Sequence, residues 1–187
     1  THPIPRPFTV MATQNPIEYE GTFPLPEAQL DRFLLMITLG YPSFDEELAN
    51  ITGHDTVHPI ESLDAVSSEK EVIAAQEAVK SVFVDDLVRR YIVTIVEATR
   101  GHADVSLGAS PRGSLALFRG AQAMAMIRRR EFVLPDDVKE LAVPMLSHRM
   151  IASAAARMRG VYAKDIITEL VEATPVPGAE AKGWVRG

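Results

Sequence analysis

Residues 88–99 read VRRYIVTIVEAT, and this stretch favours a mostly helical fold. Its apolar and small side chains recur three and four residues apart, which places them on one stripe of a helix: Val88, Tyr91, Ile92, Ile95, Val96 and Thr99. We expect this helix to pack against others, because an apolar stripe gains stability only when another surface covers it.

The sequence beyond this stretch repeats the pattern. One stripe is predicted at Leu115, Phe118, Gln122 and Ala125, with Leu117, Ala121 and Met124 alongside. Another is predicted at Val138, Leu141, Ala142 and Met145, after a start marked by Pro135, Asp136 and Asp137. A last helix is expected over residues 163–173, so the region as a whole predicts a small helical bundle.

The segment on the other side of residues 88–99 carries helix-start signals. Ser43 with Glu46, and Ser68 with Glu71, have the spacing of capping boxes. Between these two signals, residues 55–65 are expected to be extended.

Two apolar runs near the N-terminus read as buried strands, FTVMAT at residues 8–13 and FLLMITL at residues 33–39. A short helix is expected between them, over residues 27–32, with Pro26 at its start. Because two strands cannot bury each other, we expect them to end an α/β sheet whose earlier strands precede Thr1.

The predicted fold is therefore mostly α, a helical bundle preceded by the last strands of an α/β core. We assign residues 1–41 to the end of the core, residues 42–176 to the bundle and residues 177–187 to a flexible tail.

Composition fits a globular protein, with 47% hydrophobic and 24% charged residues among 187. No apolar run reaches the roughly 18 residues that a membrane span needs, and the N-terminus lacks the apolar stretch of a signal peptide. The absence of cysteine excludes disulfides and thiolate metal sites, and we expect a cytoplasmic protein.

Charge is unevenly distributed along the chain. Residues 1–109 hold 7 basic and 17 acidic residues, whereas residues 110–160 hold 9 basic and 4 acidic ones. This basic block indicates an anionic partner, such as phosphate groups, or an oppositely charged neighbour; the alternative is a solvated positive face. The overall charge of −6 argues against nucleic acid.

Asn15 is the first candidate site residue, because it directly follows a predicted strand. Ligands of open α/β sheets lie at the carboxyl ends of strands. A neutral amide there can donate to a phosphate oxygen and accept from an attacking water. The alternative is a turn, which Asn before Pro commonly forms.

Arg32 is the second candidate, at the end of a short predicted helix. A guanidinium in this place can stabilise phosphoryl charge on a neighbouring subunit. Alternatively, its charge simply complements the negative end of the helix dipole.

Arg112 is the third candidate, since Ser110 fits an N-cap and Pro111 the first helical position. A cation in the first turn opposes the helix dipole by roughly 0.3–1 kcal/mol. An anion bound at the amide ends would relieve this conflict. The alternative is a solvated arginine that tolerates the small penalty.

The remaining motifs are weaker. Arg128, Arg129 and Arg130 are expected to close a helix, with nucleic-acid binding as the alternative. His148 and Arg149 are expected to be structural or exposed. The histidines lack metal-ligand spacing, and no G-x-x-x-x-G-K-[ST] phosphate loop occurs in the sequence.

Five stretches together resemble the MoxR family of AAA+ ATPases. They are ATQNPIE (12–18), EGTFPLPEAQLDRFL (20–34), GYPS (40–43), LGASPR (107–112) and LPDDVK (134–139). The resemblance runs from Phe8 to Val176, and the first two stretches are long and specific.

The resemblance implies an ATPase that uses ATP and Mg²⁺ and works as a homo-oligomeric ring, usually a hexamer. Asn15 matches the sensor 1 position, which aligns the hydrolytic water, and Arg32 matches the arginine finger, which acts on the adjacent subunit's nucleotide. Arg112 matches the sensor 2 arginine, which binds nucleotide phosphates from the start of a lid helix.

The family's function is chaperone-like remodelling or assembly of partner proteins, often with partners that carry von Willebrand factor A domains. Its Walker A loop and Walker B strand are missing from this sequence, so we expect a C-terminal fragment that is inactive alone. The alternative is a non-catalytic helical module that binds protein.

Overall fold

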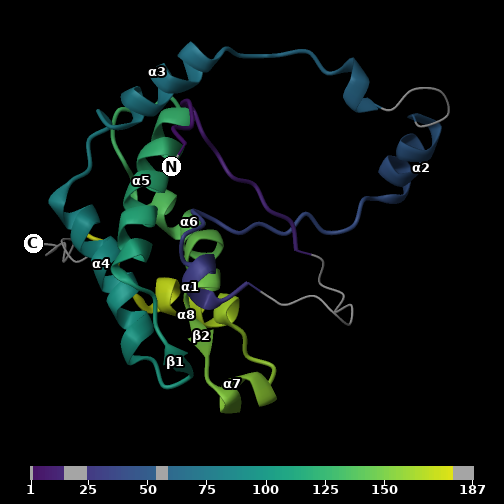
Figure 1. The fold of residues 1–187 in the computed structure, drawn as a ribbon. Coiled ribbons are helices and arrows are strands. Elements are labelled where there is room, and N and C mark those ends of the chain that lie inside the picture. The colour runs from purple at the N-terminus through teal and green to yellow at the C-terminus, as the bar shows by residue number, and fades with distance from the viewer. Residues whose placement is uncertain (1, 15–24, 54–58, 179–187) are drawn as a thin grey trace, which may run out of the picture. The chain divides into compact units, whose positions relative to one another are not determined.

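The computed structural model describes residues 2–14, 25–53 and 59–178 (Figure 1). The N-terminal elements are α1 (Glu27–Leu30), α2 (Phe44–Gly53), η1 (Pro59–Ser62) and α3 (Glu69–Val79). They are followed by α4 (Asp86–Gly101), β1 (Val105–Leu107), α5 (Pro111–Ile127), α6 (Pro135–Leu146), η2 (Ser147–Arg149), β2 (Ile151–Ala152), α7 (Ala154–Met158) and α8 (Ala163–Ala173). The mostly helical fold class is confirmed.

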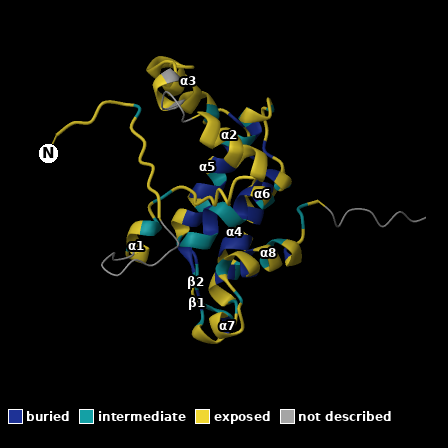
Figure 2. Ribbon diagram, turned by 90° about the vertical axis from the view of Figure 1, so that its right-hand side faces the viewer, coloured by how far each residue is buried: buried dark blue, intermediate teal, exposed yellow. Residues whose placement is uncertain are grey.

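The chain divides into two compact units. Residues 1–11 and 37–76 form the first unit, and residues 12–36 and 77–187 form the second. Every buried residue among those described lies in the second unit, in or near the helices α4, α5, α6 and α8 (Figure 2).

The core of the second unit is made by the predicted stripes. All six predicted stripe residues of α4 are buried, and so are all four predicted for α6. The prediction for α5 was wrong at Leu115, which is 65% exposed, because the buried face is centred on smaller residues, with Gly113, Ala116 and Gly120 facing inward. A Cβ at Gly120 would collide with the end of the flexible Met145 side chain, so glycine at this position leaves room for Met145 of α6.

A short two-stranded antiparallel sheet, formed by β1 and β2, was not predicted. Val105 pairs with Ala152 and Leu107 with Ile151. Strands of three and two residues are too short for an alternating pattern to stand out in the sequence, so only the fold reveals this pairing.

The two apolar runs expected as strands do not form strands. Phe8 and Met11 are 60% and 93% exposed, and Leu39 is 90% exposed. A strand is stabilised by a neighbouring ladder, and neither run has one among the described residues. Met36 instead makes a single backbone hydrogen bond of 2.8 Å to the Pro144 carbonyl oxygen.

The helix starts agree closely with the sequence. Both capping boxes form, since the Ser43 and Ser68 amides donate to the Glu46 and Glu71 carboxylates at 2.7 and 2.8 Å. The short helix α1 ends two residues earlier than expected, with Pro26 as its N-cap. The segment expected to be extended includes the 3₁₀ turn η1; residues 54–58 lie outside the described part.

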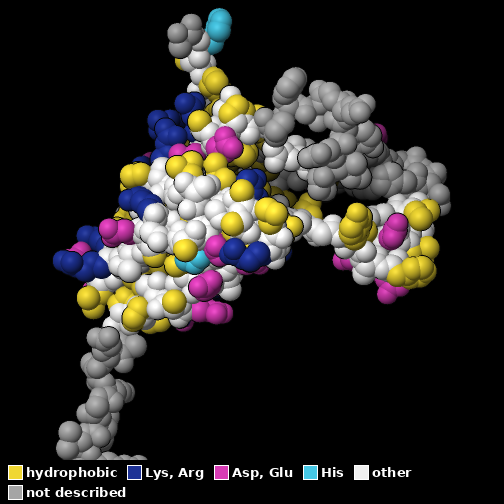
Figure 3. Space-filling view, turned by 90° about the horizontal axis from the view of Figure 1, so that it is seen from below, with side chains coloured by type: hydrophobic (Ala, Val, Ile, Leu, Met, Phe, Trp, Pro, Cys, Tyr) yellow, Lys and Arg dark blue, Asp and Glu magenta, His cyan; other side chains and the backbone are white. Residues whose placement is uncertain are grey.

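Most of the basic block is neutralised within the chain. Six of its nine basic residues form ion pairs with carboxylates: Arg112, Arg128, Arg130, Lys139, Arg149 and Arg159. The face in Figure 3 accordingly shows basic and acidic side chains close together. Within the described ranges, no helix has the length and apolar character to cross a membrane, and no three-residue metal-binding group occurs.

Candidate functional site

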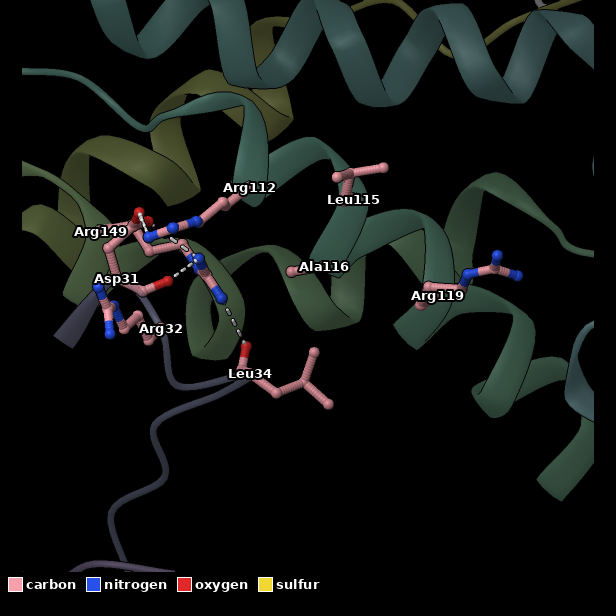
Figure 4. A pocket seen from close by; sticks show the side chains of 8 residues that line it. All are labelled: Asp31, Arg32, Leu34, Arg112, Leu115, Ala116, Arg119 and Arg149. Carbon is pink, nitrogen blue, oxygen red and sulfur yellow. Dashed lines mark hydrogen bonds and ion pairs between the residues drawn. The ribbon is translucent and has the colours of Figure 1, made fainter. Parts of the chain in front are cut away.

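An open pocket of about 400 Å³ lies within the second unit, beside the N-terminal half of α5 (Figure 4). It is lined by Asp31, Arg32, Leu34, Arg112, Leu115, Ala116, Arg119 and Arg149. Two of the three predicted site residues, Arg32 and Arg112, are therefore brought to one place, although 80 positions separate them in the sequence.

The start of α5 places Arg112 as the sequence predicted. Ser110 is the N-cap, and its Oγ accepts a hydrogen bond of 3.2 Å from the Arg112 amide. The preceding loop is held against α4, because the Ala109 amide donates to Thr99 Oγ1 at 3.0 Å and Arg100 Nε donates to the Ala109 carbonyl at 2.9 Å.

Gly108 is required by this close approach of the loop to α4. A Cβ at this position would lie 2.7 Å from the Arg100 Cα, a distance at which backbone would have to move. The glycine in the LGASPR stretch therefore sets the position at which α5 begins.

Asp31 is the centre of the polar network in the pocket. Its carboxylate accepts hydrogen bonds from Ser110 Oγ at 3.1 Å, Arg112 Nη1 at 3.2 Å and Arg149 Nη1 at 3.0 Å. The Asp31 charge thereby compensates Arg112, whose guanidinium we expected to oppose the helix dipole alone.

Arg149, like Asp31, was not predicted as a site residue. Its side chain is only 3% exposed, and its guanidinium contacts both the Asp31 carboxylate and backbone carbonyls of the turn after α1. A contact between positions 31 and 149 follows no helical or strand periodicity, so no sequence pattern could have identified it.

Arg32 differs from the other arginines of the pocket. Its side chain is exposed and makes no hydrogen bond or ion pair with any described residue. Figure 4 places Arg32 at one end of the pocket and Arg119 at the other. Arg119 is engaged, since its guanidinium donates to Gln122 Oε1 at 3.0 Å and lies 5.4 Å from the Phe118 ring centre.

His148 supports the same turn from behind. Its Nε2 lies 3.1 Å from the Phe33 carbonyl oxygen. Burial lowers the pKa of His148, an effect that the contact with Phe33 partly opposes. The third predicted site residue, Asn15, lies outside the described residues.

Family models and curated relatives both identify this chain as similar to AAA ATPases. Residues 97–170 match the AAA lid domain, and residues 1–35 match the ATPase family associated with various cellular activities. Chaperone MoxR1 of Mycobacterium tuberculosis is 38% identical over 97% of this chain and 50% of its own length. The chain belongs to the MoxR family of AAA+ ATPases.

Two further similar proteins cover the chain to a similar extent. The uncharacterized protein YeaC of Bacillus subtilis is 50% identical over 91% of this chain and 53% of its own length. The crystal structure of a putative ATPase from Cytophaga hutchinsonii superposes with a TM-score of 0.86 at 34% identity, covering 94% of this chain and 56% of that one. The chain thus spans about half the length of these relatives.

The pocket joins the two matched segments of this MoxR-family chain. Asp31 and Arg32 lie in the segment that matches the ATPase family, whereas Arg112 and Arg149 lie in the segment that matches the lid. Asp31 therefore accepts charge-assisted hydrogen bonds from two arginines of the lid segment.

Proposed function

We propose that this chain is part of an ATPase that couples ATP hydrolysis to chaperone-like remodelling or assembly of partner proteins. The observation that carries the proposal is the Asp31 network, which ties the turn bearing Arg32 to the start of the lid helix bearing Arg112. A lid that changes position with the nucleotide would thereby transmit that change to the turn.

Arg112 is proposed to bind phosphate. It lies in the first turn of a 17-residue helix, where the positive end of the helix dipole favours an anion. Its side chain is 56% exposed and is held by one carboxylate oxygen, so a phosphate group can compete for it.

Arg32 is proposed to act on a nucleotide bound by the neighbouring subunit of a homo-oligomeric ring, with a hexamer as the expected size. An exposed guanidinium without a partner among the described residues is available to another molecule. Asn15 is proposed to orient the attacking water, on the basis of its place in the sequence alone.

ATP with Mg²⁺ would supply the phosphoryl group that is cleaved and the metal charge that stabilises it. Arg112 and Arg32 fit this anion because each presents donors that match phosphate oxygens. The phosphate loop is proposed to come from the part of its relatives' length that this chain does not span. A partner with a von Willebrand factor A domain remains a proposal from the resemblance.

The test is Arg32→Ala in a full-length protein, in which this chain is joined to the region that its relatives have and this chain does not span. We expect turnover to fall about 10³–10⁵-fold, because a finger supplied across an interface contributes this much. Affinity for ATP should stay unchanged, since the finger contacts a different subunit's nucleotide.

Arg157→Ala is the matched control, because Arg157 is also an exposed arginine without an ion pair in the described structure. Turnover by this control should equal wild type. Wild-type hydrolysis by assembled Arg32→Ala rings would contradict the proposal and favour the non-catalytic, protein-binding alternative.

A further inference from the structure

We propose that Arg149 is a positioning residue, whose buried guanidinium fixes the turn 31–34 so that Arg32 is directed toward the neighbouring subunit. This inference rests on the proposed function of Arg32. It adds a role for a residue in η2, more than a hundred positions away from the finger.

The guanidinium of Arg149 has all five of its donors engaged. Nε donates to the Met145 carbonyl at 2.7 Å, which fixes the guanidinium relative to α6. Nη1 donates to the carbonyl and the carboxylate of Asp31, and Nη2 donates to the carbonyls of Phe33 and Leu34. An arginine offers five N–H donors in a rigid fork, so this one is saturated.

These bonds hold the backbone on both sides of Arg32. The carbonyls of Asp31, Phe33 and Leu34 are each bound by Arg149, whereas the Arg32 side chain makes no hydrogen bond or ion pair with a described residue. The helix before the turn, α1, has four residues and none of them is buried, so it provides little anchorage. The direction of Arg32 is therefore set by the backbone that Arg149 holds.

Arg149 and Arg112 share Asp31 in an unequal way. Arg149 binds Oδ1 from a buried position, while Arg112 binds Oδ2 from an exposed one. A phosphate that captures Arg112 would free Oδ2 but leave the bonds of Arg149 in place. The exposed arginine can thus exchange partners while the buried one keeps the turn in position.

Lysine cannot replace Arg149 in this arrangement. An ammonium group presents three donors from one point, and it cannot reach the Met145 carbonyl and three carbonyls of the turn together. The geometry therefore distinguishes a positioning role from a simple requirement for positive charge.

The test uses Arg149→Met and Arg149→Lys in the full-length ring. Misplacing a catalytic group by about 1 Å costs ~10²-fold in rate, so we expect Arg149→Met to lower kcat by this factor with KM unchanged. Arg149→Lys should lower kcat about 10-fold, because part of the fork remains unmatched. Arg159→Met is the control, since it removes another arginine paired with an aspartate, Asp104, on the surface.

A subunit-mixing experiment separates positioning from a general loss of structure. Arg149→Met subunits have a disturbed finger but an intact nucleotide site, whereas Asn15→Ala subunits have the reverse. In rings that contain the two variants in equal amounts, about half of the subunits supply an intact finger and about half supply an intact nucleotide site. Up to about one interface in four should therefore be active, because each heterologous interface combines the finger of one subunit with the site of the next. Arg32→Ala subunits should be rescued in the same way.

The outcomes distinguish this inference from the proposed function. Active Arg32→Ala rings would overturn the proposed function. The inference alone would be overturned if Arg32→Ala rings are inactive and rescued by mixing, but Arg149→Met does not behave in the same way. This means that folded Arg149→Met rings either turn over ATP within about threefold of wild type or are not rescued by mixing. If Arg149→Met does not fold, the same two criteria apply to Arg149→Lys, whose folding is checked by thermal unfolding.

Discussion

Helices α2 and α4 carry similar local signals but differ completely in burial (Figure 2). Both begin at a side-chain cap, Ser43 for α2 and Asp85 for α4. Six residues of α4 are buried, whereas α2 has none, and its Ile51 is 65% exposed.

Helix capping and helix burial have different physical causes. A capping box satisfies amides within four residues, so it forms without tertiary contacts. Burial of an apolar stripe requires an opposing face, which α5, α6 and α8 provide for α4. Helix ends are therefore local, whereas the core is not.

The largest effect on stability should come from the same substitution made in both helices. Ile95→Ala in α4 removes a fully buried side chain and should destabilise the second unit by about 3–4 kcal/mol. Ile51→Ala in α2 should change stability by less than about 0.5 kcal/mol. Denaturant unfolding measures both, and equal losses would show that α2 is buried in solution.

A smaller effect is expected at Asp137, which is fully buried at the start of α6 and paired with Arg130. Burial alone would raise the pKa of Asp137, but hydrogen bonds from Arg130 and the Leu134 amide outweigh it and lower the pKa. Asp137→Asn should cost about 2 kcal/mol at neutral pH, where the charged hydrogen bonds are complete.

The pH dependence of this effect has a definite sign. Because the pKa of Asp137 is lower in the folded state, its contribution is present above the unfolded pKa of about 4 and is lost as the pH falls through the folded pKa. Wild type and Asp137→Asn should therefore converge in unfolding free energy on acidification. Glu46→Gln in exposed α2 is the control and should leave the bundle's unfolding unchanged; a constant gap between wild type and Asp137→Asn would refute the assignment.

The next effect is on nucleotide binding. Arg112→Ala in the full-length protein should weaken ATP affinity, or its discrimination from ADP, by about 10-fold, as expected for one charge-assisted hydrogen bond. Arg6→Ala, which removes an exposed arginine of the first unit, should have no effect. Calorimetry that finds both affinities and turnover unchanged in Arg112→Ala would rule out the phosphate-binding role.

For this chain alone, we expect ATP to have no effect on thermal stability. ATP with Mg²⁺ should not raise the Tm of this chain alone, because a ligand stabilises a fold only in proportion to its binding. Titration with a fluorescent ATP analogue and an assay of phosphate release should likewise be negative. Micromolar binding with magnesium-dependent turnover would show that this chain alone forms a complete nucleotide site.

Much of the second unit could be predicted from the sequence. The Ser110 cap, the start of α5 at Pro111 and the full extent of α8 follow from residues within one or two helical turns. The stripe of α4 follows from a period of 3.6 residues, and the placement of Arg112 in a first turn follows from the cap.

The pairing of strands and the composition of the pocket could not be predicted from the sequence. The apolar runs at residues 8–13 and 33–39 suit a strand, but a strand exists only when a ladder partner lies beside it. Asp31, Arg112 and Arg149 meet because α5, η2 and the turn after α1 pack together, and residues so far apart leave no periodic trace in the sequence. Local backbone hydrogen bonding is determined by neighbouring residues in the sequence, whereas the environment of a buried charge is determined by the distant residues that the fold packs around it.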